Sequence, residues 1–241
     1  MNTELSRFVK DFDPVSYWSV LFAPTDRRDA LLSLYAFAVE IKRIPLVVSE
    51  PALGEIRMQW WIDGLKGERG GELQSHPQGQ ALLETCARYA LPHAPLIAHI
   101  EARASRLAQD DPMRQPDESA LELYCGQTNA SLIQLASLIL NDGRDPQTSE
   151  VSGHAGMVLG LIELIREGTT ELSQQDLVQL AREHFIKTRH ALNTIPDKIK
   201  PVFLPLVGAE NFLNQLSRGR LVEHAALSPW RILLRMMRGR I

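Results

Sequence analysis

The sequence predicts an all-α protein, and three observations support that prediction. Helix-forming Leu, Ala, Gln, Glu and Arg are abundant in the 241 residues, and 44% of the chain is hydrophobic, enough to bury a sizeable core. No run shows the apolar and polar alternation between turn residues that is typical of strands. Between Asp117 and Leu140, apolar residues instead recur at steps of three and four, the period of a buried helix face. A single domain over residues 1–241 is expected.

Proline and glycine residues set the expected helix boundaries. Pro24 opens the longest helix of the first half, and Pro45 is expected to stop or kink that helix at Ile44. The glycines of 67–71 indicate an exposed turn, and the prolines of 196–205 indicate an irregular segment. The expected helices cover residues 14–22, 25–44, 51–65, 79–90, 94–108, 117–140, 151–166, 174–193 and 229–241.

Composition argues against several classes of function. The net charge of -3 argues against attraction to nucleic acid, so no nucleic-acid partner is expected. Neither the two cysteines, Cys86 and Cys125, nor the seven histidines have ligand spacing, so no metal site is expected. The N-terminus does not resemble a signal peptide, and no stretch approaches the roughly 20 apolar residues that cross a bilayer. A cytoplasmic location is expected, with peripheral contact at the inner face of the cytoplasmic membrane left open.

The end of the chain is predicted to form a basic amphipathic helix over about 229–241. Between Ser217 and Ile241 six arginines stand against one acid, so this stretch has a net charge of +5 and the remainder -8. Apolar and basic residues fall on opposite faces, a pattern typical of helices that lie on a membrane surface. Docking of this helix on the protein's own core is an equal alternative. The residues expected to reach a membrane are Trp230, Arg231, Leu234, Arg235 and Arg238.

Three segments resemble the squalene and phytoene synthase superfamily. They are YWSVLFAPTDRR at 17–28, the LYAF helix at 34–37 and a glycine-rich helix ending at Arg166. The resemblance implies an isoprenoid synthase fold, a helical bundle around a central cavity. Active members bind magnesium and a substrate diphosphate through a DDxxD motif, which becomes Lys42, Arg43 and Leu46 here. Magnesium requires hard oxygen ligands, which two cations and a leucine cannot supply.

The second acidic motif of that superfamily is also altered. Its best match begins at Gly156 but lacks the expected Gln and Asn, and glutamates replace aspartates. Under the resemblance, Glu163, Glu167 and Glu171 are the weak catalytic candidates, although Gly168 indicates a helix stop between the last two. Magnesium is expected only if these residues serve a divergent prenyl transferase, and no cofactor is expected otherwise.

A denser resemblance covers Ala36–Trp61, and it is to a branch of the superfamily that includes the mitochondrial respiratory complex I assembly factor. It implies a catalytically degenerate protein that assists complex I assembly at the membrane, with complex I subunits or assembly intermediates as partners. Two alternatives stay open: a head-to-head prenyl transferase acting on farnesyl or geranylgeranyl diphosphate, and a protein that binds a prenyl lipid. The partner-binding candidates are Ser49, Glu50, Arg57, Gln59, Trp60 and Trp61.

Other residues are candidates for a ligand site. Lys42, Arg43 and Arg57 would make the former diphosphate cavity cationic and suit a phosphorylated ligand bound without metal. A competing interpretation pairs Glu40 with Arg43, three residues apart on one helix. Each cavity candidate also has a structural interpretation as a core residue whose polar atoms are satisfied internally. The cavity-lining candidates are Tyr35, Gln127, Asn129 and His154.

Overall fold

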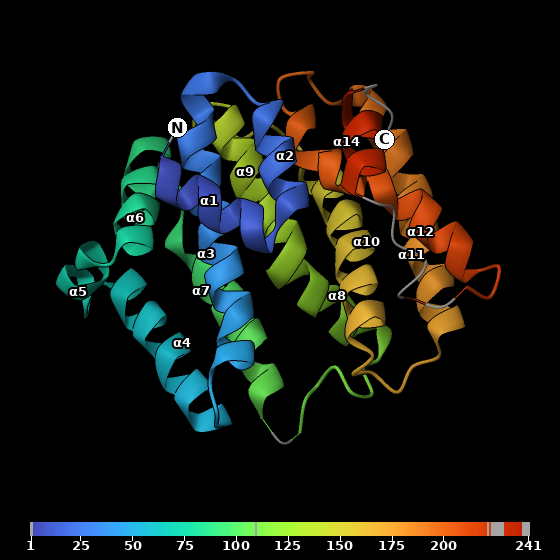
Figure 1. Ribbon diagram of the computed structural model, residues 1–241, viewed down its shortest axis with the longest axis horizontal. Helices are drawn as coiled ribbons and strands as arrows, with labels where there is room; N and C mark the ends of the chain where they lie inside the picture. The colour runs from blue at the N-terminus through green and yellow to red at the C-terminus, as the bar shows by residue number, and fades with distance from the viewer. Residues whose placement is uncertain (1, 109, 221, 223–228, 238–241) are drawn as a thin grey trace. The chain divides into compact units, whose positions relative to one another are not determined.

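The computed structural model describes residues 2–108, 110–220, 222 and 229–237, and the elements in this part of the chain are all helical (Figure 1). The all-α prediction is therefore confirmed. The chain forms two compact units: Met1–Asp111 with Leu138–Pro146, and Pro112–Ser137 with Gln147–Ile241. The expectation of one domain over 1–241 stays a prediction.

Helix α3 is the centre of the first unit. It contacts α1, α2, α4, α6 and α7, and residues on most of its circumference are buried, as expected for a helix that is apolar nearly all round. Phe37 and Ile41 of α3 pack in this core with Met58 and Trp61 of α4. The helices are α1 (Thr3–Phe12), α2 (Pro14–Leu21), α3 (Arg28–Val47), α4 (Pro51–Lys66), α5 (Gly70–Ser75), α6 (Pro77–Tyr89) and α7 (His93–Ala104), with 3-10 turns η1 (Thr25–Arg27) and η2 (Ser105–Leu107).

Three details of the first unit differ from the prediction. Helix α3 does not stop at Ile44 but continues through Pro45 to Val47. Pro45 lies in the last turn, so its missing N–H removes only one hydrogen bond near the helix end. The glycine-rich stretch after Gly67 contains the short helix α5, and Thr3–Phe12 forms a helix that no sequence pattern had indicated.

Helix α10 is the centre of the second unit, in contact with α8, η3, α11, α12 and η5. The long helix expected over 117–140 is interrupted by a π-helical turn. Helix α12 follows the proline-containing segment 196–205, and no helix was expected there. The boundary between the two units falls within α9. The elements are α8 (Glu118–Cys125), η3 (Gly126–Ala130), α9 (Ser131–Leu140), α10 (Ser149–Glu167), α11 (Gln174–Ala191), η4 (Leu192–Thr194), η5 (Lys200–Gly208), α12 (Ala209–Leu216) and α14 (Pro229–Met237).

Glycine residues let α10 approach the π-helical turn closely. A Cβ atom on Gly156 would lie 2.5 Å from the Cβ and backbone nitrogen of Ala130, so a side chain has no room there. Gly160, one turn further, faces Cys125 and the amide of Asn129 in the same way. Gly153 on the same helix has open space around it. Small residues at Gly156 and Gly160 therefore allow close packing of α10 against this turn.

Candidate functional site

The hairpin of α3 and α4 holds the three positions at which the superfamily's DDxxD motif would lie. Lys42 is exposed, and Leu46 is 79% exposed. The guanidinium of Arg43 lies 3.4 Å from the ring centre of Phe12 and 5.6 Å from that of Phe8, a stacking contact with α1. An exposed ammonium, a stacked guanidinium and an aliphatic chain do not fit magnesium, which requires oxygen ligands.

An ion pair joins α3 to α4 within the same hairpin. Arg57 Nη2 donates a hydrogen bond of 2.5 Å to Glu40 Oε1, and Glu40 is otherwise buried. The expected intrahelical pair of Glu40 with Arg43 is therefore wrong, because the carboxylate is turned toward the neighbouring helix. Arg43 and Arg57 both have partners within their own unit, and their binding of a phosphorylated ligand stays a prediction.

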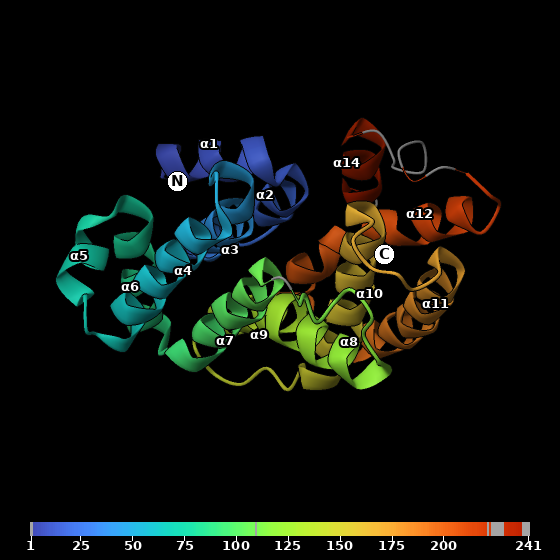
Figure 2. The same cartoon turned by 90° about the horizontal axis from the view of Figure 1, so that it is seen from below.

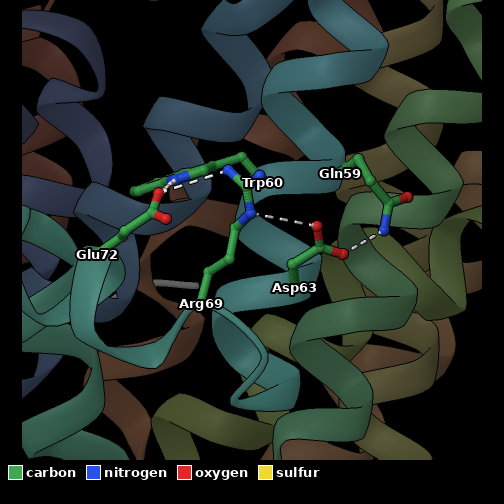
Figure 3. Close-up of polar contacts among 5 residues, drawn as sticks. All are labelled: Gln59, Trp60, Asp63, Arg69 and Glu72. Atoms are coloured by element: carbon green, nitrogen blue, oxygen red, sulfur yellow. Dashed lines mark hydrogen bonds and ion pairs between the residues drawn. The ribbon is translucent and has the colours of Figure 1, made fainter.

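A polar network ties the middle of α4 to α5 (Figure 3). Gln59 Nε2 donates to Asp63 Oδ1 over 2.6 Å, and Arg69 Nε lies 3.9 Å from Asp63 Oδ2. Trp60 Nε1 donates to Glu72 Oε2 over 3.0 Å, and the same carboxylate pairs with Arg69. Gln59 Nε2 and Trp60 Nε1 thus have partners within the first unit, and partner binding by these two residues stays a prediction.

Trp61 is a core residue. Only 1% of it is exposed, and its ring packs edge-on against Phe37 and His76, each with ring centres 5.5 Å apart. Its selection as a partner-binding candidate is corrected, because a fully buried indole cannot reach another protein. Ser49 and Glu50, in the connection between α3 and α4, are exposed.

The three glutamates of the second acidic motif do not share a helix face. Helix α10 ends at Glu167, where Gly168 takes a left-handed conformation with φ 63°. Glu171 lies beyond this stop, and its hydrogen bonds from Gln115 and Arg114 lower the pKa of its carboxyl. Within the described residues, no three or more His, Cys, Asp or Glu side chains are grouped so as to hold a metal ion. Glu163 and Glu167 lie one turn apart on α10, and magnesium binding by them stays a prediction tied to the prenyl transferase alternative.

The polar cavity candidates are buried or half-buried. Burial raises the pKa of Tyr35 above its ordinary value, with a smaller contribution from the charge of Asp13. Gln127 is half-buried, and Asn129 Nδ2 donates to Thr128 Oγ1 over 3.2 Å within the π-helical turn. A role in lining a cavity stays a prediction for all of these residues.

His154 forms a pair that sequence reasoning missed. Its Nδ1 lies 3.1 Å from Nδ1 of His184, which projects from α11 and is buried. Burial first, and then the charges of His154 and Lys187, lower the pKa of His184. The two histidines are 30 residues apart on different helices, so no spacing in a single sequence could have indicated the contact.

Helix α14 packs on η5, and among its described side chains Met236 is buried. Leu234 and Met237, expected on an apolar face, are 45% and 60% exposed. The side chains of Trp230, Arg231 and Arg235, and all of Arg238, lie outside the described residues. In the part of the chain that the structure describes, no helix is long and apolar enough to cross a membrane.

Known proteins match this chain along most of its length. The squalene/phytoene synthase family profile matches residues 9–174. The human protein named NADH dehydrogenase (ubiquinone) complex I, assembly factor 6 is 25% identical, with 86% of this chain and 71% of the relative covered. The Drosophila melanogaster homologue is 23% identical, over 89% and 75%.

An enzyme of the same family also matches. Presqualene diphosphate synthase of Zymomonas mobilis is 25% identical over 154 residues, which cover 63% of this chain and 50% of the enzyme. The match to the assembly factors thus extends over more of this chain than the match to the enzyme. Its all-α architecture and the family profile over residues 9–174 together show that the chain belongs to the squalene/phytoene synthase family.

Proposed function

We propose that this protein assists the assembly of respiratory complex I and does not catalyse prenyl transfer. The observation that carries the proposal is the α3–α4 hairpin, where the acidic positions of the family are Lys42, Arg43 and Leu46. Arg43 is stacked on Phe12, and Leu46 is exposed, so neither can serve as a magnesium ligand. A shared fold does not carry an activity once the residues of the site have changed.

The relatives named complex I assembly factors support the same conclusion. Complex I subunits or assembly intermediates are the proposed partners. The proposed location is peripheral, at the inner face of the cytoplasmic membrane. Exposed Leu234 and Met237 on α14 support contact with a membrane or a membrane-bound partner, whereas Met236 is buried.

Deleting the gene in the organism that carries it tests this function. Complex I activity and the amount of assembled complex should fall, and the pools of isoprenoids should stay unchanged. A chain with Glu163→Gln and Glu167→Gln should restore complex I as well as the unaltered chain does, because the proposed function needs no metal-binding carboxylates. Normal complex I in the deletion strain would overturn the proposal.

The match to presqualene diphosphate synthase favours a second candidate, a divergent prenyl transferase acting on farnesyl or geranylgeranyl diphosphate. Purified protein incubated with labelled farnesyl diphosphate and magnesium distinguishes the two functions. An assembly protein should release no diphosphate above background. Turnover that requires magnesium and disappears in Glu167→Gln would favour the enzyme.

A further inference from the structure

Two arginines and an isoleucine form an exposed stripe along α11. Ile186 follows Arg182 by four residues and precedes Arg189 by three, so the three side chains share one side of the helix. Ile186 is 68% exposed, and both arginines are exposed. The aliphatic stems of arginines add apolar area around such a residue, while their charged ends stay in water.

Helix α12 lies alongside this stripe (Figures 1 and 2). Arg182 Nη1 donates to Ser217 Oγ over 3.1 Å, and Arg189 Nη1 donates to Glu210 Oε1 over 3.3 Å. The two contacts are seven residues, or two turns, apart on each helix and come in opposite order along the chain. The helices therefore run in opposite directions here, and Ile186 of α11 lies between the two contacts.

One more arginine joins this surface from the end of α12. Glu210, Asn214 and Arg218 follow one another at steps of four and so form a row along one side of α12. The turn stays helical as far as Arg218, whose backbone N–H donates to the carbonyl of Gln215 over 3.2 Å. Because the row begins at the contact of Glu210 with Arg189, it runs beside the α11 stripe, and Arg218 at its other end is exposed. We call four residues the arginine seam: Arg182, Ile186, Arg189 and Arg218.

This part of the chain is basic when every charged residue is counted. From the start of α11 to the end of the chain, residues 174–241 contain 11 lysines and arginines and five aspartates and glutamates, a net charge of +6. The rest of the chain carries -9. The acids nearest the seam are Glu210, which pairs with Arg189, and Glu183, which Lys187 follows by one helical turn. The seam is therefore a positive surface on a chain that is acidic elsewhere.

The spread of the arginines favours an anionic bilayer over an acidic or phosphorylated peptide. Sites that bind such peptides gather arginines around one anion. Arg182 and Arg189 are instead about 10.5 Å apart along the helix axis, with Ile186 between them. Each guanidinium has five N–H donors and uses one in its contact with α12, so the others can bind lipid phosphates. A bilayer offers anions along the whole seam and an acyl boundary for the isoleucine.

We propose that the arginine seam is a surface through which this chain binds an anionic bilayer. The proposal rests on the peripheral membrane location given with the assembly function above. It adds to that location a surface outside α14, formed by α11 and the end of α12. The contact is electrostatic with one apolar anchor, Ile186, so it should weaken as the salt concentration rises.

Flotation of the purified full chain with vesicles tests the ligand. The chain should bind vesicles of phosphatidylcholine and phosphatidylglycerol in equal parts at low salt, and it should lose most of this binding at about 0.5 M salt. It should not bind vesicles of phosphatidylcholine alone. Equal binding to both kinds of vesicle would overturn the proposal, and so would a lack of binding to the anionic vesicles at low salt.

A matched pair of variants tests whether the seam carries the binding. Arg182→Gln with Arg218→Gln removes two charges from the seam, and Arg7→Gln with Arg144→Gln removes two exposed arginines of the first unit, so both variants have the same net charge. Each arginine near an anionic surface contributes about fivefold in affinity, so the seam variant should bind at least about tenfold more weakly. The control should bind as the unaltered chain does, and equal urea midpoints should show that both fold. An equal loss in the two variants would overturn the proposal, because net charge alone would then account for the binding.

The apolar anchor has its own matched pair. Ile186→Glu should lower vesicle binding at least about tenfold, because the new carboxylate would have to leave water beside lipid phosphates. Leu123→Glu, on α8 and 62% exposed in the unaltered chain, adds the same charge and should change binding by less than about twofold. Equal effects of the two substitutions would overturn the proposal.

Photo-crosslinking in cells separates lipid from other occupants of the seam. A chain with benzoylphenylalanine at Ile186 should give no dominant adduct with one protein. An abundant adduct with an acidic protein, or with a second copy of this chain, would overturn the proposal. Failure of vesicle binding leaves the assembly function standing, whereas normal complex I in the deletion strain would refute the assembly function and leave the vesicle result unchanged.

Discussion

The arginine seam and the contact between α10 and η3 use apolar and small residues in opposite ways. In the seam, Ile186 remains largely exposed, so its burial contributes little to folding. At the α10 contact, Gly156 leaves no room for even one methyl group, and the two helices meet backbone to backbone. The difference separates residues that stabilise the fold from residues available for binding. Substitutions at the α10 contact should change stability, and those in the seam should change only association.

Gly156→Ala gives the largest expected effect. Its new Cβ would lie within 2.6 Å of the Ala130 backbone, so α10 or η3 must move, and overpacking of this kind destabilises by about 2–3 kcal/mol. Gly153→Ala, three residues earlier with open space around it, should instead stabilise by up to about 1 kcal/mol because alanine favours the helix. Urea unfolding of both variants measures the difference. Equal midpoints would mean that the α10 contact is looser than described and would remove the contrast with the seam.

Acid should weaken the second unit through His184. Its pKa is lowered in the folded chain, so the unfolded chain binds a proton more readily. The stability is complete above the ordinary histidine pKa of about 6.5 and falls as the pH drops below it, by at most about 1.4 kcal/mol per pH unit for one proton. The groups that act on His184 are His154 and Lys187, which lower its pKa, and Glu122 and Glu183, which raise it.

Urea midpoints at pH 7.5 and 5.5 measure this effect. His184→Asn should flatten the dependence between these pH values, whereas His190→Asn, an exposed histidine of the same helix, should leave it unchanged. A pH dependence of the midpoint that is unchanged in His184→Asn would show that the lowered pKa of His184 is not its source.

Arg57→Met tests the boundary between the exposed and the buried part of the α3–α4 hairpin, with the smallest expected effect. The side chain of Glu40 is 11% exposed and loses its partner, but that of Arg57 is 46% exposed and screened by water. A loss of about 1 kcal/mol or less is expected. A double-mutant cycle with Glu40→Gln isolates the pair, and a coupling energy of zero would mean that the pair does not set the register of α3 against α4.

Much of the fold could be predicted because helix periodicity and helix-ending residues are local signals. Pro51 at the start of α4, Gly67 at its end and Gly168 at the end of α10 were all identified correctly. The expected stop at Pro45 was wrong because a proline near a helix end removes only one hydrogen bond, and the alternative of a kink there stays a prediction. The π-helical turn at Gly126–Ala130 had no signal in the sequence, because its residues keep the apolar spacing of an ordinary helix.

The candidate site was harder to predict than the fold. The sequence indicated the segment 36–61, but it could not tell exposed from buried residues within it. Trp60 and Trp61 are adjacent, yet one donates to Glu72 on the surface and the other is enclosed by Phe37 and His76. Which neighbours surround each indole depends on α3, α5 and α6, whose positions the segment itself does not contain.

By itself, the sequence determined the helical class, most helix boundaries, and the replacement of the family's acidic positions by Lys42, Arg43 and Leu46. Only the tertiary structure decided that Glu40 pairs with Arg57, that His154 meets His184, and that Leu46 and Ile56 are exposed. The physical reason is the range of the interactions. A period of 3.6 residues tells which side chains share a helix face, whereas the partner of that face comes from a helix elsewhere in the chain.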